Sequence, residues 1–233
     1  MRFLSLMALL LLFPFEGLSQ SGVPTTFLIR IENISVENTL QGPSGNIPLP
    51  LAPGVWAVHT STRPLFASGL ADTGIGVEAL AEDGIPDPLA ATLSNQSGIV
   101  SSGVFNTPVG ETGPGPLLPG GIYEFVFTAT SGTKLSFATM FVQSNDLFYA
   151  PTELGIALFD SRGLPLEGDI TSLIRLWDAG TEINQPPGIG LDQAPRQARA
   201  NVGQTENGVV RQVSDGYSYP DVDEVIRVTI TPQ

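Results

Sequence analysis

Short stretches in which apolar and polar residues alternate recur along this chain, and this is the pattern of β-strands that are buried on one face. Thr25–Glu32 (TTFLIRIE) places Phe27, Ile29 and Ile31 on the same side. Gly54–Ser61 (GVWAVHTS) predicts a second strand. Further strands are expected at Gly98–Phe105, Leu154–Phe159, Ile170–Trp177, Val209–Ser214 and Asp221–Ile230.

The two strongest apolar runs lie next to each other, at Tyr123–Thr130 and Thr133–Val142. Ser131 and Gly132 separate them, which is the two-residue spacing of a tight β-turn. The pattern therefore predicts a hairpin. The second run is apolar on both faces, so it is expected to be a central strand.

Residues 64–94 differ from the rest of the chain because they are rich in Ala, Leu, Glu and Gly. Asp87 and Pro88 form a helix-start signal, so one or two short helices are expected here. Residues 40–53, 106–121 and 180–207 predict loops. Together these patterns predict an all-β fold, an antiparallel β-sandwich of about eight strands with a short helical insertion near residues 64–94.

The chain begins with a stretch that is typical of a secretory leader. Arg2 precedes an apolar run from Phe3 to Phe15, and small residues follow at Gly17 and Ser19. We predict a signal peptide over residues 1–19, cleavage near Ser19/Gln20, and a secreted product, extracellular or periplasmic. Residues 20–233 are predicted to be one domain without a membrane span, because no later apolar run is long enough.

Composition narrows the classes of function. The 233 residues include 23 Asp and Glu against 10 Lys and Arg, a net charge of −13. This charge disfavours binding to nucleic acid or to anionic lipid and favours divalent cations. The 26 glycines and 20 prolines suit short strands joined by turns. The absence of cysteine excludes disulfides, thiolate metal sites and a cysteine nucleophile.

Several kinds of catalytic site find no support. The chain has no Gly-x-Ser-x-Gly elbow, phosphate-binding loop, dinucleotide fingerprint or His-Glu-x-x-His motif. His59 is the only histidine, and a structural role is favoured over a catalytic or metal-binding one. An acidic cluster in the helical region could bind metal, although a solvated helical face also explains it; it comprises Asp72, Glu78, Glu82, Asp83 and Asp87.

Three other carboxylates, Asp146, Asp178 and Glu182, lie just beyond the ends of apolar segments. Gly180 allows the backbone to turn between the last two, so that both can face one point. Calcium takes six to eight oxygen ligands from carboxylates, carbonyls and water. The three residues are therefore a candidate metal site, with solvated loop charges or a pair of glycosidase carboxylates as the alternatives.

Several motifs accompany these carboxylates. They are Pro53–His59 (PGVWAVH), Phe66–Ala71 (FASGLA), Ala79–Gly84 (ALAEDG), Ser136–Met140 (SFATM), Ser144–Phe148 (SNDLF), Trp177–Glu182 (WDAGTE) and Tyr217–Pro220 (YSYP). With them, the chain resembles the spondin N-terminal domain, the domain of F-spondin and mindin, which also occurs as a stand-alone exported protein in bacteria. The resemblance covers roughly Thr25–Thr231.

The resemblance implies a β-sandwich related to C2 domains, with Ca2+ bound by Asp146, Asp178 and Glu182. Glu182 stands where the family normally has Asp, and Leu147 where the animal domains usually have Trp. Unlike the animal domains, this chain lacks cysteine.

We therefore expect a secreted calcium-binding module for extracellular binding or adhesion, and not an enzyme. Calcium would clamp two loops at one end, and the partner would be an extracellular protein or polysaccharide. One alternative is an exported carbohydrate-active enzyme that uses the loop carboxylates as acid and base. Another is a purely structural surface-layer protein without a ligand.

Overall fold

The smaller of two stacked sheets is built around strand β1 (Thr25–Asn33), whose alternating pattern buries Phe27, Ile29 and Ile31 completely. A computed structural model describes residues 22–233, so the predicted leader lies outside the described residues. Strand β1 pairs with β6 (Ile122–Ala129) on one side and β13 (Ile226–Pro232) on the other. The short β10 (Gly168–Asp169) extends this sheet beyond β13. All these pairings are antiparallel.

The larger sheet is also antiparallel and has the order β12-β11-β8-β7-β4-β5, with β9 paired to one end of β7. Its strands are β4 (Leu51–His59), β5 (Ile99–Phe105), β7 (Lys134–Phe141), β8 (Leu147–Ala150), β9 (Ile156–Ala157), β11 (Arg175–Asp178) and β12 (Arg211–Gln212). Eight strands among the described residues have four or more residues. The predicted all-β, antiparallel sandwich is thus confirmed, and β7 is a central strand as expected.

The predicted hairpin between the two strongest runs is wrong. Strand β6 pairs with β1 in the smaller sheet, whereas β7 pairs with β4 and β8 in the larger one. The link between them, closed by the bond from Thr133 N to Thr130 O (3.2 Å), carries the chain from one sheet to the other. Gly132, at φ 90°, makes this short crossing possible. In this arrangement both strands direct apolar faces into the space between the sheets.

The core between the sheets is rich in aromatic side chains. Trp56 stacks on Phe125 with 5.5 Å between ring centroids and 5° between planes. Phe105 also stacks on Phe125, at 5.3 Å, and Phe27 stacks on Phe127 at 5.6 Å. Because these rings come from both sheets, their burial holds the two layers together.

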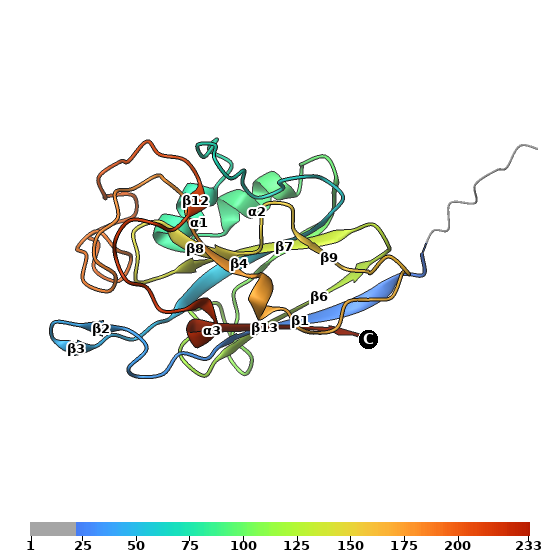
Figure 1. Cartoon of the computed structure of the whole chain (residues 1–233), viewed down its shortest axis with the longest axis horizontal. Coiled ribbons are helices and arrows are strands. Elements are labelled where there is room, and N and C mark those ends of the chain that lie inside the picture. Colours follow the sequence, from blue (N-terminus) through green and yellow to red (C-terminus); the bar gives the residue numbers. More distant parts are fainter. Residues whose placement is uncertain (1–21) are drawn as a thin grey trace, which may run out of the picture.

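The predicted helical insertion is confirmed. Helix α1 (Val77–Asp83) and helix α2 (Asp87–Leu93) pack on the outer face of the larger sheet, as Figure 1 shows. Leu80 and Leu89 belong to a second apolar cluster that includes Ala138 of β7. A strand covered on both faces must be apolar on both, which explains the composition of β7.

Two of the predicted strands begin with a helical turn instead. A 3₁₀ turn, η1 (Thr171–Leu173), precedes β11, and helix α3 (Val222–Val225) precedes β13. At the N-cap of α3, Asp221 N donates to Glu224 Oε2 (3.3 Å), as in a capping box. A small hairpin of β2 (Gln41–Gly42) and β3 (Gly45–Asn46) lies within the first predicted loop.

The long irregular segment between β11 and β12 lies at one end of the sandwich, near α1 and β8 (Figure 1). Gln197 Nε2 of this segment donates to Asp83 Oδ1 of α1 at 2.8 Å. No helix in residues 22–233 is long and apolar enough to cross a membrane.

Candidate metal centre

Asp146 occupies the tight turn between β7 and β8. Ser144 shapes this turn, because its Oγ donates to Phe141 O (2.6 Å) and accepts from Leu147 N (3.0 Å). Asp146 is fully buried. Its Oδ2 accepts three bonds from the loop after β11: from Thr181 N (2.8 Å), Thr181 Oγ1 (3.2 Å) and Glu182 N (3.1 Å). The side chain therefore joins two loops.

Asp178 is the last residue of β11, and the pairing with β8 sets it opposite Leu147. It too is fully buried. Its Oδ1 accepts from Gly180 N (2.7 Å), and its Oδ2 accepts from Asn184 Nδ2 (2.9 Å) and Arg211 Nη2 (2.8 Å). Gly180 has φ +71°, and a Cβ there would lie 2.6 Å from Val209 N, so glycine is required at this turn.

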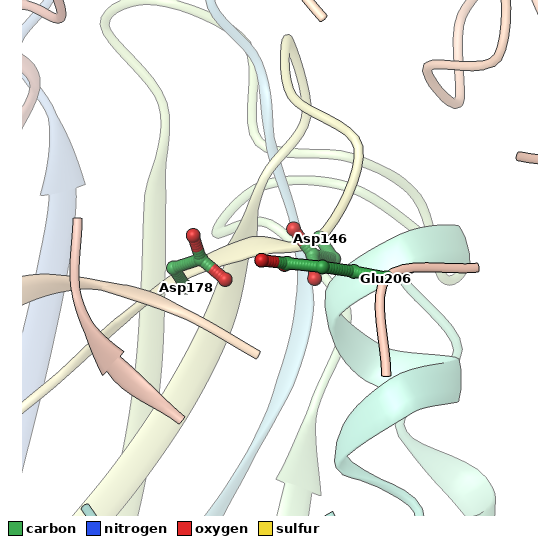
Figure 2. Close-up of side chains that lie close together, drawn as sticks. All are labelled: Asp146, Asp178 and Glu206. Atoms are coloured by element: carbon green, nitrogen blue, oxygen red, sulfur yellow. The ribbon is translucent and has the colours of Figure 1, made fainter. Parts of the chain in front are cut away.

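Glu206 completes a group of three carboxylates with Asp146 and Asp178, which we call the acidic triad. One oxygen of each residue lies within 4.8 Å of the others. Figure 2 shows the three side chains converging from separate segments. Backbone bonds place Glu206 there, from Glu206 N to Thr181 O (2.8 Å) and from Gly208 N to Gly180 O (2.7 Å). The triad can hold a metal ion.

Glu182, the third residue of the predicted set, lies beside the triad but outside it. Its backbone N donates to Asp146. Its carboxylate points elsewhere, because Oε1 accepts from Gly203 N (2.7 Å) and Oε2 accepts from Asn145 Nδ2 (3.2 Å). The structure thus brings Asp146 and Asp178 together, while Glu182 as a ligand stays a prediction.

Burial dominates the electrostatics of the triad. It raises the pKa of Asp146 to about 6 and that of Asp178 to about 7. The charge of Asp146 adds to the shift of Asp178, and Arg211 opposes it. Asp146 Oδ1 is buried and has no hydrogen-bond partner. An unpartnered carboxylate oxygen among other carboxylates is the environment that a bound cation relieves.

One cationic side chain already contacts the triad. Arg211, at the start of β12, donates through Nη2 to Asp178 Oδ2 (2.8 Å) and to both oxygens of Glu206 (2.8 and 3.0 Å). Its side chain is 31% exposed, whereas Asp178 has no exposed surface. The guanidinium offsets one of the three negative charges, and Asp146 receives no bond from it.

His59 lies apart from this centre and is fully buried. One ring nitrogen bonds to Ser136 Oγ (2.9 Å) and the other to Ser61 O (2.8 Å). Burial lowers the pKa of the imidazole, so the neutral form is favoured. With both nitrogens occupied and no exposed surface, His59 has the structural role that the sequence favoured.

No protein-family model matches this chain, and the comparison with curated proteins gives no match either. The resemblance to the spondin N-terminal domain therefore stands on the motifs themselves. Two of its three predicted ligands, Asp146 and Asp178, lie together in the acidic triad.

Proposed function

We propose that the chain is a secreted calcium-binding β-sandwich of the spondin N-terminal type, which acts as a module for extracellular binding or adhesion. One observation carries the proposal: carboxylate oxygens of Asp146, Asp178 and Glu206 lie within 4.8 Å of one another, and the first two side chains are fully buried. Such a concentration of buried negative charge is costly without a counter-cation.

The donor set favours calcium over other metals. The triad offers only oxygen, which suits hard cations, and neither cysteine nor the single histidine takes part. Calcium accepts six to eight ligands in flexible geometry, whereas magnesium demands a nearly ideal octahedron and keeps several waters. Three carboxylates on three separate segments, with waters or carbonyls in addition, match calcium better.

The role that we infer for the ion is that of a structural clamp. Asp146 comes from the β7–β8 turn, Asp178 from the end of β11, and Glu206 from the segment before β12. An ion held by all three would tie these segments together at one end of the sandwich. The ordered end would then present a surface to an extracellular protein or polysaccharide.

Catalysis by the same carboxylates is supported less well, although their raised pKa values suit an acid and a base. A glycosidase must place a sugar between its two carboxyl groups. Asp146 and Asp178 have no exposed surface, and the adjoining cavity is lined by Thr181 and Glu182 instead. An ion, in contrast to a sugar, needs contact only with the carboxylate oxygens of Asp146 and Asp178.

Thermal unfolding of the purified protein after treatment with a chelator tests the proposal. Calcium at 100 times its Kd should stabilise the fold by about 2.7 kcal/mol. For a chain of this length the melting temperature should rise by roughly 5–10 °C. Magnesium at the same concentration should give a smaller rise.

Variants locate the site. Asp178→Asn and Glu206→Gln should abolish most of the calcium response, while the exposed Glu111→Gln should keep it. Glu182→Gln distinguishes the two candidates for the third ligand, and we expect it to retain the response. A wild-type protein that does not respond to calcium would refute the proposal.

A further inference from the structure

A second acidic feature adjoins the triad: a cavity of about 270 Å³ between α1, the loop after β11 and residues 201–208. Carboxylates of Asp72, Glu78, Glu82 and Glu182 are among the groups that line it. A neighbouring cavity of about 260 Å³ shares Asp72, Glu78 and Glu82 with the first. No lysine or arginine lines either cavity.

Glu82 is the group that points to a ligand. It is only 3% exposed, and its Oε2 has no hydrogen-bond partner. The helical pattern places it on α1 with Ala81 and Leu80, which pack against the larger sheet. Burial raises the pKa of Glu82 to about 8, and the nearby Glu182 adds to this shift. Thr181 opposes the shift through its side chain, but a buried carboxyl oxygen that lacks a donor is costly unless something else supplies one.

The other carboxylates of the wall already have partners. Glu182 accepts from Gly203 N and Asn145 Nδ2, and Glu78 Oε1 accepts from Asn201 Nδ2 at 3.2 Å. Asp72 Oδ2 accepts from Gly74 N at 3.3 Å. These bonds fix the shape of the wall, and Glu82 lines both cavities beside the bonded groups.

The charge of the wall identifies the class of ligand. Four acidic side chains without a basic neighbour disfavour anions, and a bound cation favours the charged form of Glu82. A metal ion is less suitable, because the triad is the only group of three metal-ligating side chains within residues 22–233 whose ligand atoms lie within 4.8 Å of one another. A neutral hydroxyl would donate to Glu82 but would leave the negative charge uncompensated. A cation that also donates N–H bonds supplies both the missing hydrogen-bond donor and the positive charge.

We propose that this cavity binds an alkylammonium group, either the side chain of a lysine on a partner polypeptide or a free amine. Its three N–H donors can bond to the Glu82 carboxylate and to the remaining acceptors of the wall. The proposal does not depend on calcium at the triad, because Asp146, Asp178 and Glu206 do not line this cavity.

The test uses three probes at 0.15 M salt, which screens the general attraction of an acidic protein for cations. The first is a Gly-Ser peptide with one central lysine, capped at both ends. The second is the same peptide with norleucine in place of lysine. The third is cadaverine, a free diamine. Binding is measured by calorimetric titration and by NMR chemical-shift changes.

We expect saturable 1:1 binding of the lysine peptide or of cadaverine, and none of the norleucine peptide. Whichever amine binds more tightly shows whether the natural ligand is a lysine side chain or a free amine. Glu82→Gln should weaken binding at least tenfold and Glu78→Gln several-fold. The matched control Glu111→Gln, with the same change in net charge on an exposed loop, should stay within twofold of wild type.

Four results would overturn the proposal. If Glu111→Gln weakens amine binding as much as Glu82→Gln does, the attraction is general and not specific to the cavity. Binding of the norleucine peptide would exclude recognition of the ammonium group. If neither amine binds saturably, the cavity does not take this ligand. Displacement of the amine by calcium in Glu206→Gln protein would assign the cavity to a metal. If Glu82→Gln does not fold, the half-buried Glu78→Gln decides the outcome.

Discussion

Arg211 offers the sharpest prediction, because the same guanidinium that stabilises the ion-free centre should oppose a bound ion. Arg211→Gln removes the positive charge and keeps a polar side chain. The arginine lies 2.8 Å from Asp178 Oδ2 and 2.8 Å from the nearer oxygen of Glu206. Bonds to charged groups contribute about 1.5–3 kcal/mol. Since the arginine is 31% exposed, we expect a loss of about 1–2 kcal/mol in the ion-free protein.

The effect on calcium affinity has the opposite sign. Two unit charges 4 Å apart interact by about 4 kcal/mol at an effective dielectric constant of 20. A guanidinium that bonds to two of the three triad residues therefore repels calcium strongly, or must move away before calcium binds. Even after most of this energy is screened by solvent, Arg211→Gln should bind calcium at least tenfold more tightly, about 1.4 kcal/mol.

Calorimetric titration and thermal unfolding, each with and without calcium, measure both effects. Arg30→Gln is a matched control, because Arg30 bridges Glu124 (2.8 Å) and Glu32 (3.1 Å) in the smaller sheet with a side chain that is 37% exposed. The control should leave calcium affinity unchanged. Unchanged or weaker calcium binding by Arg211→Gln would show that the guanidinium does not oppose an ion at the triad.

Three further predictions concern pH, the turn at the centre, and the core. Burial raises the pKa of Glu82 to about 8, so the stabilisation from protonated Glu82 is complete below about pH 4.5 and is lost as the pH rises to 8. In ion-free protein, the unfolding free energy of Glu82→Gln should therefore fall less steeply from pH 5 to 8 than that of the wild type. An unchanged slope would contradict this prediction. Gly180→Ala should cost about 1–3 kcal/mol, and wild-type stability would show that the positive φ is not required. Phe137→Ala should cost about 3–5 kcal/mol by chemical denaturation, against about 0.5 kcal/mol for the exposed Val126→Ala; similar losses would contradict the assigned core.

The fold was largely predictable because alternation reports burial directly. Strand β1 and the helical insertion follow from local pattern alone. The hairpin prediction failed because a two-residue gap between apolar runs fits either a hairpin or a crossing between sheets. Which one forms depends on β1 and β4, distant strands that pair with β6 and β7. That information is absent from the local sequence.

The site was predictable only in part for the same reason. Asp146 and Asp178 lie at the ends of apolar segments, and this position can be recognised in the local sequence. Glu206 lies in an irregular segment without periodicity, and backbone bonds to the loop after β11 bring it to the triad. Glu82 has the sequence context of a solvated helical face, yet it is only 3% exposed and lines a cavity together with Gly203. Neither fact could be inferred from spacing.

Diffraction from crystals soaked in calcium, with anomalous data, would show directly whether the acidic triad binds the ion. We predict one calcium ion at the acidic triad, within about 2.3–2.6 Å of carboxylate oxygens of Asp146, Asp178 and Glu206. The side chain of Arg211 should no longer bond to Glu206. A triad without an ion at saturating calcium, with Arg211 still bonded to Asp178 and Glu206, would contradict the account.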